Sequence, residues 1–355
     1  MSPLKGVFLG VCRSAGLFRI ARLLTRRSLR ILCYHGFSSR DEHEFRPQLF
    51  MKPSTFRARL AYLRDAGYPV LDLGRALEGL RQGNLPVNPV VITVDDGFRN
   101  VRALALGILG EFSFPGTVYV TTYYVERNHP VFRLAVQYMF WKSGKAQADL
   151  EKAGLPAEAA ALGKASAGPW DIIAYCEKEC SEERRVEILR VLGSHLGVDA
   201  ADLEKAGTLT LMDAGEVAEL LGKGVDIQLH THRHRLPDDK AGLDREIQDN
   251  RRVLTALGAK GLDHFCYPSG IWSRPQWPML AALGVRSATT CEPGFNYPDT
   301  PPMGLRRFLD SEAIAQIEFE AELSGFLEIM RKLTGKSART AALASSGGGN
   351  PKTGA

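Results

Sequence analysis

The chain has 355 residues, 45% of them hydrophobic, enough to build one large α/β barrel or two smaller domains. Its net charge of +5 is unevenly spread: residues 1–40 hold eight Lys and Arg and no acidic residue, which leaves 37 basic and 40 acidic residues, or −3, elsewhere. The basic character therefore belongs to a leader segment and gives no support to a nucleic-acid-binding body, so we expect no nucleic-acid partner.

Residues 1–28 are expected to form a basic amphipathic leader helix, interrupted near Gly16. Arginines fall mostly between apolar positions that recur at helical spacing, namely Leu4, Val7, Phe8, Val11, Leu17, Ile20, Ala21 and Leu24. Two readings stay open: a helix that packs on the outside of the barrel, or a peripheral anchor on anionic lipid.

The apolar run at 6–12 is too short to span a bilayer, and no small-residue cleavage site follows it. The chain has six cysteines, and none of them forms a CxxC pair. We therefore expect reduced thiols, no zinc–thiolate site and a cytoplasmic location, with membrane association through residues 1–28 as the open alternative.

Strands and helices are expected to alternate from residue 30 onwards. Apolar and β-branched runs predict strands at 30–35, 90–94 and 116–122, and Pro53 and Gly67 bracket a helix at 52–67. An Ala-, Glu-, Lys- and Leu-rich helical insert occupies about 128–210. The insert is expected to form a lid, a substrate wall or an oligomer contact.

The alternation resumes after the insert. Helices are expected at 214–222, 243–257, 275–283 and 312–333, and strands at 225–229, 264–267, 286–290 and 305–309. This order predicts a parallel sheet with right-handed crossovers, curled into a closed or nearly closed barrel. The expected organisation is a leader (1–28), a barrel with its insert (29–334) and a Gly-rich disordered tail (335–355).

Two adjacent carboxylates, Asp95 and Asp96, directly follow the buried strand at 90–94. The carboxyl edge of a parallel sheet is where active sites collect. Adjacent carboxylates repel, so a shared role calls for a cation or a proton. One carboxylate would then bind a metal while the other acts as a base; the alternative is a plain Asp-Gly turn.

Three alternating histidines follow the strand at 225–229, in the segment HTHRH (230–234). His230 and His234 are four residues apart, so one turn brings both to one cation and leaves His232 facing elsewhere. With Asp96 they make a two-histidine, one-carboxylate metal site with open positions. Such a site could serve hydrolysis or oxygen chemistry, and a neighbouring base, Asp95, favours hydrolysis.

These segments resemble a known family. ITVDDGF (92–98), HTHRH (230–234) and FCYPSG (265–270) are similar to three ordered motifs of the polysaccharide deacetylases, carbohydrate esterase family four. The segments RILCYHG (30–36) and 51–70 also look like this family, in the branch that includes the poly-N-acetylglucosamine deacetylases. The resemblance covers about 30–125 and 210–310 and leaves the insert outside.

The resemblance implies a distorted (β/α)7 barrel and a divalent metal, zinc in the first place, with Ni²⁺, Co²⁺, Mn²⁺ or Fe²⁺ as alternatives. It implies that Asp96, His230 and His234 are the metal ligands and that Asp95 is the general base. Thr231 resembles the small hydroxyl residue that braces the ligand loop.

The sequence departs from the commonest family pattern in two ways. That pattern ends in a Leu-His motif that supplies the general acid, and here no His follows His264. In the branch named above a His on the first strand takes this place, which assigns the acid to His35; a core His at a strand end is the alternative. The third motif also lacks the usual Arg that orients the base. Arg307 is the expected substitute, and Arg306 could exchange roles with it.

The implied reaction is hydrolysis of an N-acetyl amide on a carbohydrate: a polysaccharide, a lipid-linked glycan or an amino sugar. Water activated by the metal and Asp95 attacks the carbonyl, a backbone N–H near Tyr267 stabilises the oxyanion, and His35 protonates the leaving amine. Tyr267 and Trp272 are candidates to shape the acyl pocket or stack on a sugar, or they are plain packing. Hydrolysis of another C–N amide, of the deformylase or cyclic-amide type, and a non-enzymatic carbohydrate-binding scaffold are the competing readings.

Overall fold

The fold is known from a computed structural model, which describes residues 3–127 and 129–334. Its centre is a seven-stranded sheet in the order β10-β9-β8-β5-β4-β1-β11. Every neighbouring pair in this sheet is parallel. The strands are β1 (Arg30–Tyr34), β4 (Val90–Val94), β5 (Thr117–Val120), β8 (Asp226–Leu229), β9 (His264–Cys266), β10 (Ser287–Thr289) and β11 (Phe308–Leu309).

The sheet curls until its two edges meet. β11 pairs with β1 at one edge, while Leu305, three residues earlier, makes a parallel bridge to Thr289 of β10 at the other edge. The predicted (β/α) barrel is thereby confirmed. All seven predicted strands are present, although most are shorter than expected; the last shrinks to two residues because its start turns to the other edge.

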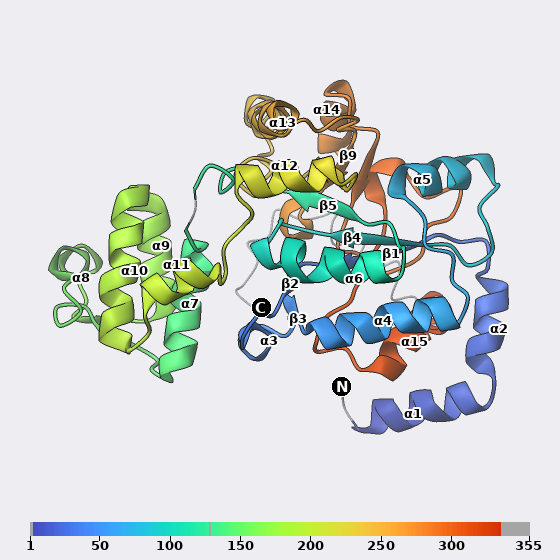
Figure 1. The fold of residues 1–355 in the computed structure, drawn as a ribbon, viewed down its shortest axis with the longest axis horizontal. Helices are drawn as coiled ribbons and strands as arrows, with labels where there is room; N and C mark the ends of the chain where they lie inside the picture. Colours follow the sequence, from blue (N-terminus) through green and yellow to red (C-terminus); the bar gives the residue numbers. More distant parts are fainter. Residues whose placement is uncertain (1–2, 128, 335–355) are drawn as a thin grey trace.

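Helices cover the outside of the barrel (Figure 1). They are α4 (Pro53–Asp65), α5 (Leu73–Gln82), α6 (Leu106–Glu111), α12 (Ala214–Gly222), α13 (Lys240–Ala256) and α14 (Gln276–Ala282). A π-helical turn (Val101–Ala105) leads into α6, and a 3₁₀ turn follows β9 (Pro268–Gly270) and another precedes β11 (Pro302–Gly304). α13 begins three residues earlier than predicted, because the side chain of Asp239 accepts a hydrogen bond from the N–H of Gly242 and caps it there.

The segment between β5 and β8 forms a helical lobe beside the carboxyl ends of the strands, drawn green in Figure 1. It contains α7 (Phe132–Ser143), α8 (Pro156–Leu162), α9 (Pro169–Glu179), α10 (Glu182–Leu196), α11 (Ala200–Ala206) and the antiparallel pair β6 (Ala148–Asp149) and β7 (Ser166–Ala167). α3 (Glu42–Phe45) and the parallel pair β2 (Gly36–Phe37) and β3 (Phe50–Met51) lie between the barrel and α7.

The leader forms two helices, α1 (Pro3–Ser14) and α2 (Leu17–Leu24), separated where Gly16 takes a left-handed conformation (φ 78°). They pack on α15 (Gln316–Leu323) and α16 (Phe326–Leu333). The single helix predicted at 312–333 was wrong. Gly325 breaks it with φ 84°, and a Cβ there would lie 2.4 Å from the hydroxyl of Thr25, so the close approach of α2 requires glycine.

Three further expectations concern the ends and the thiols. The tail predicted to be disordered, 335–355, lies outside the described residues. All six cysteines are free. Among the described helices, none combines the length and apolar character needed to cross a membrane.

Candidate metal and catalytic centre

Most of the chemically active side chains gather at the carboxyl ends of the central strands, and Arg307 joins them from the start of another strand. Asp95 and Asp96 follow β4, His35 follows β1, the histidine segment follows β8, and Arg307 immediately precedes β11. Because parallel strands end at the same edge, Asp96 and His230 become neighbours although they are 134 positions apart in the sequence.

Asp96, His230 and His234 form one cluster. Oδ1 of Asp96 lies 3.1 Å from Nε2 of His230 and 3.2 Å from Nε2 of His234. One ligand atom from each residue lies within 4.8 Å of the others. His230 is buried, whereas Asp96 and His234 are partly exposed, so the cluster is held from below and open to solvent above.

The donor set fits a cation. Nδ1 of His230 lies 2.9 Å from the carbonyl oxygen of Cys266, which can only accept, so this nitrogen carries the proton. Nε2 of the same ring then presents a lone pair to the carboxylate of Asp96. That contact is favourable only with a second proton or a metal ion between the two groups. A carboxylate and two imidazole Nε2 atoms are ligands that suit Zn²⁺ and neighbouring transition metals.

The hydrogen bonds also shift the pKa values within this cluster. Burial raises the pKa of Asp96, but the hydrogen bonds from His230 and His234 outweigh it and hold the pKa well below its ordinary value. Burial lowers the pKa of His230, and the hydrogen bond to Asp96 more than reverses this. The cluster therefore keeps an ionised carboxylate at its centre.

Backbone strain is concentrated at the same place. Asp96 (φ 69°), Thr231 (φ 61°) and His234 (φ 54°) all occupy the left-handed region that non-glycine residues rarely adopt. Each such residue costs about 1–3 kcal/mol and persists only where its surroundings enforce it. Strain at two of the three candidate ligands, and at Thr231 directly after the third, is typical of a functional site.

Asp95 is held by Arg307 from below. The guanidinium donates to both carboxylate oxygens at 2.7 Å, and both side chains are buried. The thiol of Cys266 donates to the same carboxylate at 3.2 Å. Burial raises the pKa of Asp95, but the charge and hydrogen bonds of Arg307 have the larger, opposite effect. The net result is a pKa far below the ordinary value, so the carboxyl group stays ionised. Arg306 points to the opposite side and lines another hollow, as alternation along an extended chain requires.

His35 stands above Asp95 on the solvent side. Its Nε2 lies 3.9 Å from Oδ2 of Asp95, and about a fifth of the side chain is exposed. The structure thus brings six predicted catalytic and metal residues to one place. Their roles remain predictions.

The two predicted substrate contacts belong to one aromatic stack, and Trp272 lines the same separate hollow as Arg306. Tyr267 is buried, its hydroxyl donates to the carbonyl of Met303 at 3.0 Å, and its N–H donates to the carbonyl of Thr289. Trp272 stacks between Tyr267 and Trp277, with ring centroids 6.0 and 5.2 Å apart. An oxyanion donor near this position would therefore not be the N–H of Tyr267 itself.

Two residues of α13 support the histidine segment and were missed in the sequence. The side chain of Asn250 accepts from the N–H of His230 at 3.0 Å, and Glu246 accepts from the N–H of Arg233 at 2.7 Å. The available signal was two polar residues on the buried face of the helical pattern.

His232 does face elsewhere, towards the hydroxyl of Thr122 at 2.9 Å. The buried hydroxyl of Thr231 has no partner among the described residues, and the loop is held instead through its carbonyl, by Thr121.

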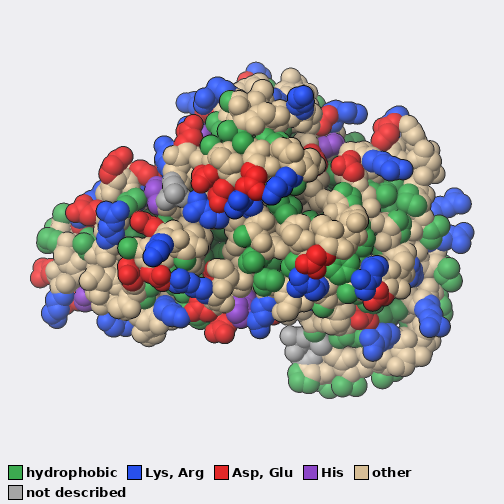
Figure 2. Space-filling model, viewed as in Figure 1, with side chains coloured by type: hydrophobic (Ala, Val, Ile, Leu, Met, Phe, Trp, Pro, Cys, Tyr) green, Lys and Arg blue, Asp and Glu red, His purple; other side chains and the backbone are tan. Residues whose placement is uncertain are grey.

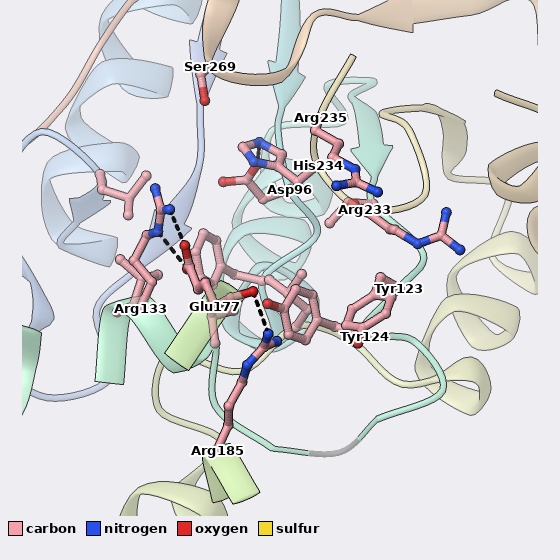
Figure 3. Close-up of a pocket in the computed structure, with 16 residues that line it drawn as sticks. Asp96, Tyr123, Tyr124, Arg133, Glu177, Arg185, Arg233, His234, Arg235 and Ser269 are labelled. Carbon is pink, nitrogen blue, oxygen red and sulfur yellow. Dashed lines mark hydrogen bonds and ion pairs between the residues drawn. The ribbon is translucent and has the colours of Figure 1, made fainter. Parts of the chain in front are cut away.

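A cleft of about 640 Å³ opens over Asp96 and His234. The insert supplies its far wall with Arg133 of α7, Glu177 of α9 and Arg185 of α10 (Figure 3). Arg133 donates to the carboxylate of Glu177 at 2.6 and 3.0 Å, and Arg185 donates to the backbone carbonyl of Glu177 at 2.9 Å. The cleft therefore lies between the metal cluster and a cross-linked helical wall.

Comparison with known families agrees with this arrangement. The family model described as polysaccharide deacetylase matches residues 188–288, which include HTHRH and FCYPSG but not the two aspartates. The resemblance predicted from the motifs is confirmed, and so is the predicted enzyme class, a hydrolase that acts on N-acetyl C–N bonds. A search of curated proteins gives no match.

Solved structures show the same fold. The deacetylase PplD of Streptococcus pyogenes has a TM-score of 0.54 at 17% identity, over 86% of this chain and 99% of its own. IcaB of Ammonifex degensii has a TM-score of 0.53 at 16% identity, over 84% and 97%. A de-N-acetylase from Aggregatibacter actinomycetemcomitans has a TM-score of 0.53 at 12% identity, over 83% and 99%. The chain therefore shares its fold with these three proteins.

Proposed function

We propose that the protein is a metal-dependent deacetylase that hydrolyses an N-acetyl amide on a carbohydrate. The observation that carries the proposal is the pairing of two clusters at one barrel edge. Asp96, His230 and His234 offer an open three-ligand site, and the adjacent Asp95 is an ionised carboxylate fixed by Arg307. A cation site beside a fixed base is the arrangement that hydrolysis by activated water requires.

Asp96, His230 and His234 would hold the metal, with Zn²⁺ the first choice for this donor set and Ni²⁺, Co²⁺, Mn²⁺ or Fe²⁺ as alternatives. When bound, the ion would polarise the amide carbonyl and lower the pKa of water. The carbonyl of Cys266 fixes the tautomer of His230, which supports this role.

Asp95 accepts a proton from the attacking water in this proposal. Arg307 orients the carboxylate and keeps it ionised, which makes the arginine a positioning residue. A carboxylate with a lowered pKa is a weak base, so Asp95 would take a proton from water only where a cation held by the neighbouring ligands had lowered the pKa of that water. The two functions are therefore coupled: base catalysis by Asp95 depends on the neighbouring metal site.

His35 donates a proton to the leaving amine. Its Nε2 lies 3.9 Å from the carboxylate of Asp95 and its side chain is partly exposed, so it stands on the open side of the site, where a leaving amine would depart. Tyr267 would shape the acyl pocket, since it directly follows Cys266, whose thiol donates to Asp95, and Trp272 stacks on it.

The cleft supports a substrate larger than a single acetamide group. Its volume of about 640 Å³ falls within the range of about 300–1,000 Å³ usual for ligand sites. The insert, as the far wall, would contact the sugar units that flank the reacting one. For the cellular setting we propose a cytoplasmic location, supported by six free thiols.

The test is acetate release from a panel of N-acetylated glycans, after the purified protein is stripped of metal and reloaded with one divalent ion at a time. We expect metal-dependent acetate release from at least one glycan. Formate release, or hydrolysis of cyclic amides in place of glycans, would transfer the protein to the alternative amide hydrolases. Metal-independent turnover would reject the proposed centre.

A further inference from the structure

The N-terminal helices carry two apolar stripes, and the barrel covers only one of them. The covered stripe comprises Leu9 and Cys12 of α1 and Phe18 and Ala21 of α2, which pack against α15 and α16. The second stripe has side chains between 39% and 84% exposed: Leu4, Val7, Phe8, Val11, Leu17, Ile20, Leu23 and Leu24. We call these eight residues the outer stripe.

The outer stripe is a large fraction of the exposed apolar surface. It supplies eight of the thirteen exposed large hydrophobic side chains in the described part of the chain. On α1 its members recur at positions 4, 7, 8 and 11, which is the spacing of one continuous helix face. Figure 2 shows hydrophobic side chains along the lower edge of the molecule, over α1. Soluble monomers rarely expose contiguous apolar patches unless a partner covers them.

The charge around the outer stripe identifies the partner. Residues 1–40 contain no acidic side chain; Lys5 and Arg13 of α1 pair with Glu318 and Glu320 of α15, while Arg19, Arg26 and Arg27 are exposed on or next to α2. A second copy would bring two surfaces of the same positive sign together. A surface that is apolar in the middle and basic at its margin is instead complementary to anionic lipid.

We propose that α1 and α2, while packed on the barrel, bind the surface of an anionic lipid bilayer through the outer stripe. α2 leads into β1 at the amino ends of the strands, whereas the cleft lies beyond their carboxyl ends. Binding to the bilayer therefore leaves the cleft uncovered, and it is separable from the proposed deacetylase function.

The test is flotation of the full-length protein with vesicles of phosphatidylcholine alone or with one part phosphatidylglycerol in three. We expect the protein to float with the anionic vesicles and to lose this binding in high salt. Changing Arg19, Arg26 and Arg27 to Gln together should lower anionic-vesicle binding about 100-fold, since each basic side chain near the surface contributes roughly a factor of five.

A matched pair of double variants isolates the apolar contribution. Phe8→Gln with Ile20→Gln should lower binding at least about 10-fold, because both side chains would enter the lipid. Trp170→Gln with Ile271→Gln alters an aromatic and an isoleucine of similar exposure elsewhere and should leave binding unchanged. Circular dichroism checks that each variant keeps its helices.

Three results would overturn the proposal. The first is that the full-length protein stays with the vesicle-free fraction, and the second is that both double variants float equally well. The third is a lipid-free dimer of the unaltered protein that the Phe8→Gln, Ile20→Gln variant abolishes, which would show that a second copy covers the outer stripe.

Discussion

Proteins usually bury apolar side chains and expose charged ones, and two regions of this molecule break that rule in opposite ways: the barrel centre and the N-terminal helices. Beneath the cleft, Asp95 and Arg307 are charged and buried, whereas the outer stripe of α1 and α2 is apolar and exposed. Buried charge is costly unless it is paired, and exposed apolar surface is costly unless something covers it. At the centre the partner is supplied within the fold. At the leader helices it must come from outside the molecule.

The difference separates two kinds of function. A buried ion pair fixes a carboxylate at a defined point, as chemistry on a substrate requires. A helix face of exposed apolar groups holds no single atom at a defined point. It provides a broad apolar contact area, as adhesion to a surface requires. The following predictions test each side of this comparison, from the largest expected effect to the smallest.

Loss of a metal ligand should have the largest effect. His230→Ala removes one of three ligands, and we expect activity to fall well over 100-fold, since even a supporting group of a ligand is worth about 10–100-fold. Elemental analysis of the purified variant should show loss of the divalent metal. A variant that retains a full equivalent of metal would remove His230 from the ligand set.

Removal of the proposed base should separate catalysis from metal binding. Asp95→Asn keeps the shape of the side chain and one of the two acceptor oxygens that Arg307 uses, and it leaves Asp96, His230 and His234 unaltered, so metal content should be unchanged while turnover falls about 10²–10⁴-fold. The measurement is the rate of acetate release per bound metal ion in the variant, compared with the same rate in the unaltered protein. Full activity in this variant would show that another group activates the water.

The loss of rate caused by substituting His35 should depend on the leaving group of the substrate. His35→Asn should slow deacetylation of an amino sugar by about 10²–10⁴-fold, because the amine must be protonated as it leaves. An aryl acetate needs no such proton, so its hydrolysis should fall much less. Asp95→Asn is the control, since it should slow both reactions. Equal losses of both activities in His35→Asn would argue against its role as the acid.

The two apolar stripes of the leader should differ in how much they contribute to the free energy of unfolding. Phe18 is buried against Phe326, with ring centroids 5.3 Å apart, so Phe18→Ala should lower the free energy of unfolding by about 3 kcal/mol. Ile20 is exposed, and Ile20→Ala should change it by less than about 0.5 kcal/mol. Urea denaturation measures both. A large loss in Ile20→Ala would mean that the protein itself covers the outer stripe.

Substitution in the cleft wall should have the smallest effect, and that effect should be on substrate binding alone. Arg185 donates to Glu177 and lines the cleft away from the metal cluster, so Arg185→Gln should raise KM for an oligosaccharide by about fivefold, with kcat unchanged. The KM for a single amino sugar should not move. If the two substrates respond alike, the insert is not a wall that contacts flanking sugars.

Much of the centre followed from local sequence. Asp95, Asp96 and the histidine segment each directly follow a strand that could be recognised from its β-branched residues, and parallel strands must end at one edge. That reasoning required no knowledge of distances. It could not reach Asn250 and Glu246, because a polar residue on a helical pattern does not indicate which loop it supports.

The sequence by itself thus determined the alternation of strands and helices, the deacetylase motifs and the basic leader, since these depend on residues close together in the chain. The tertiary structure decided which of two adjacent arginines reaches Asp95 and that the insert forms one wall of the cleft. It also decided which stripe of the leader is buried: of the eight apolar positions seen in the sequence, only Ala21 is covered. These choices depend on contacts between residues tens to hundreds of positions apart, and a periodic pattern records that a face is apolar without recording what covers it.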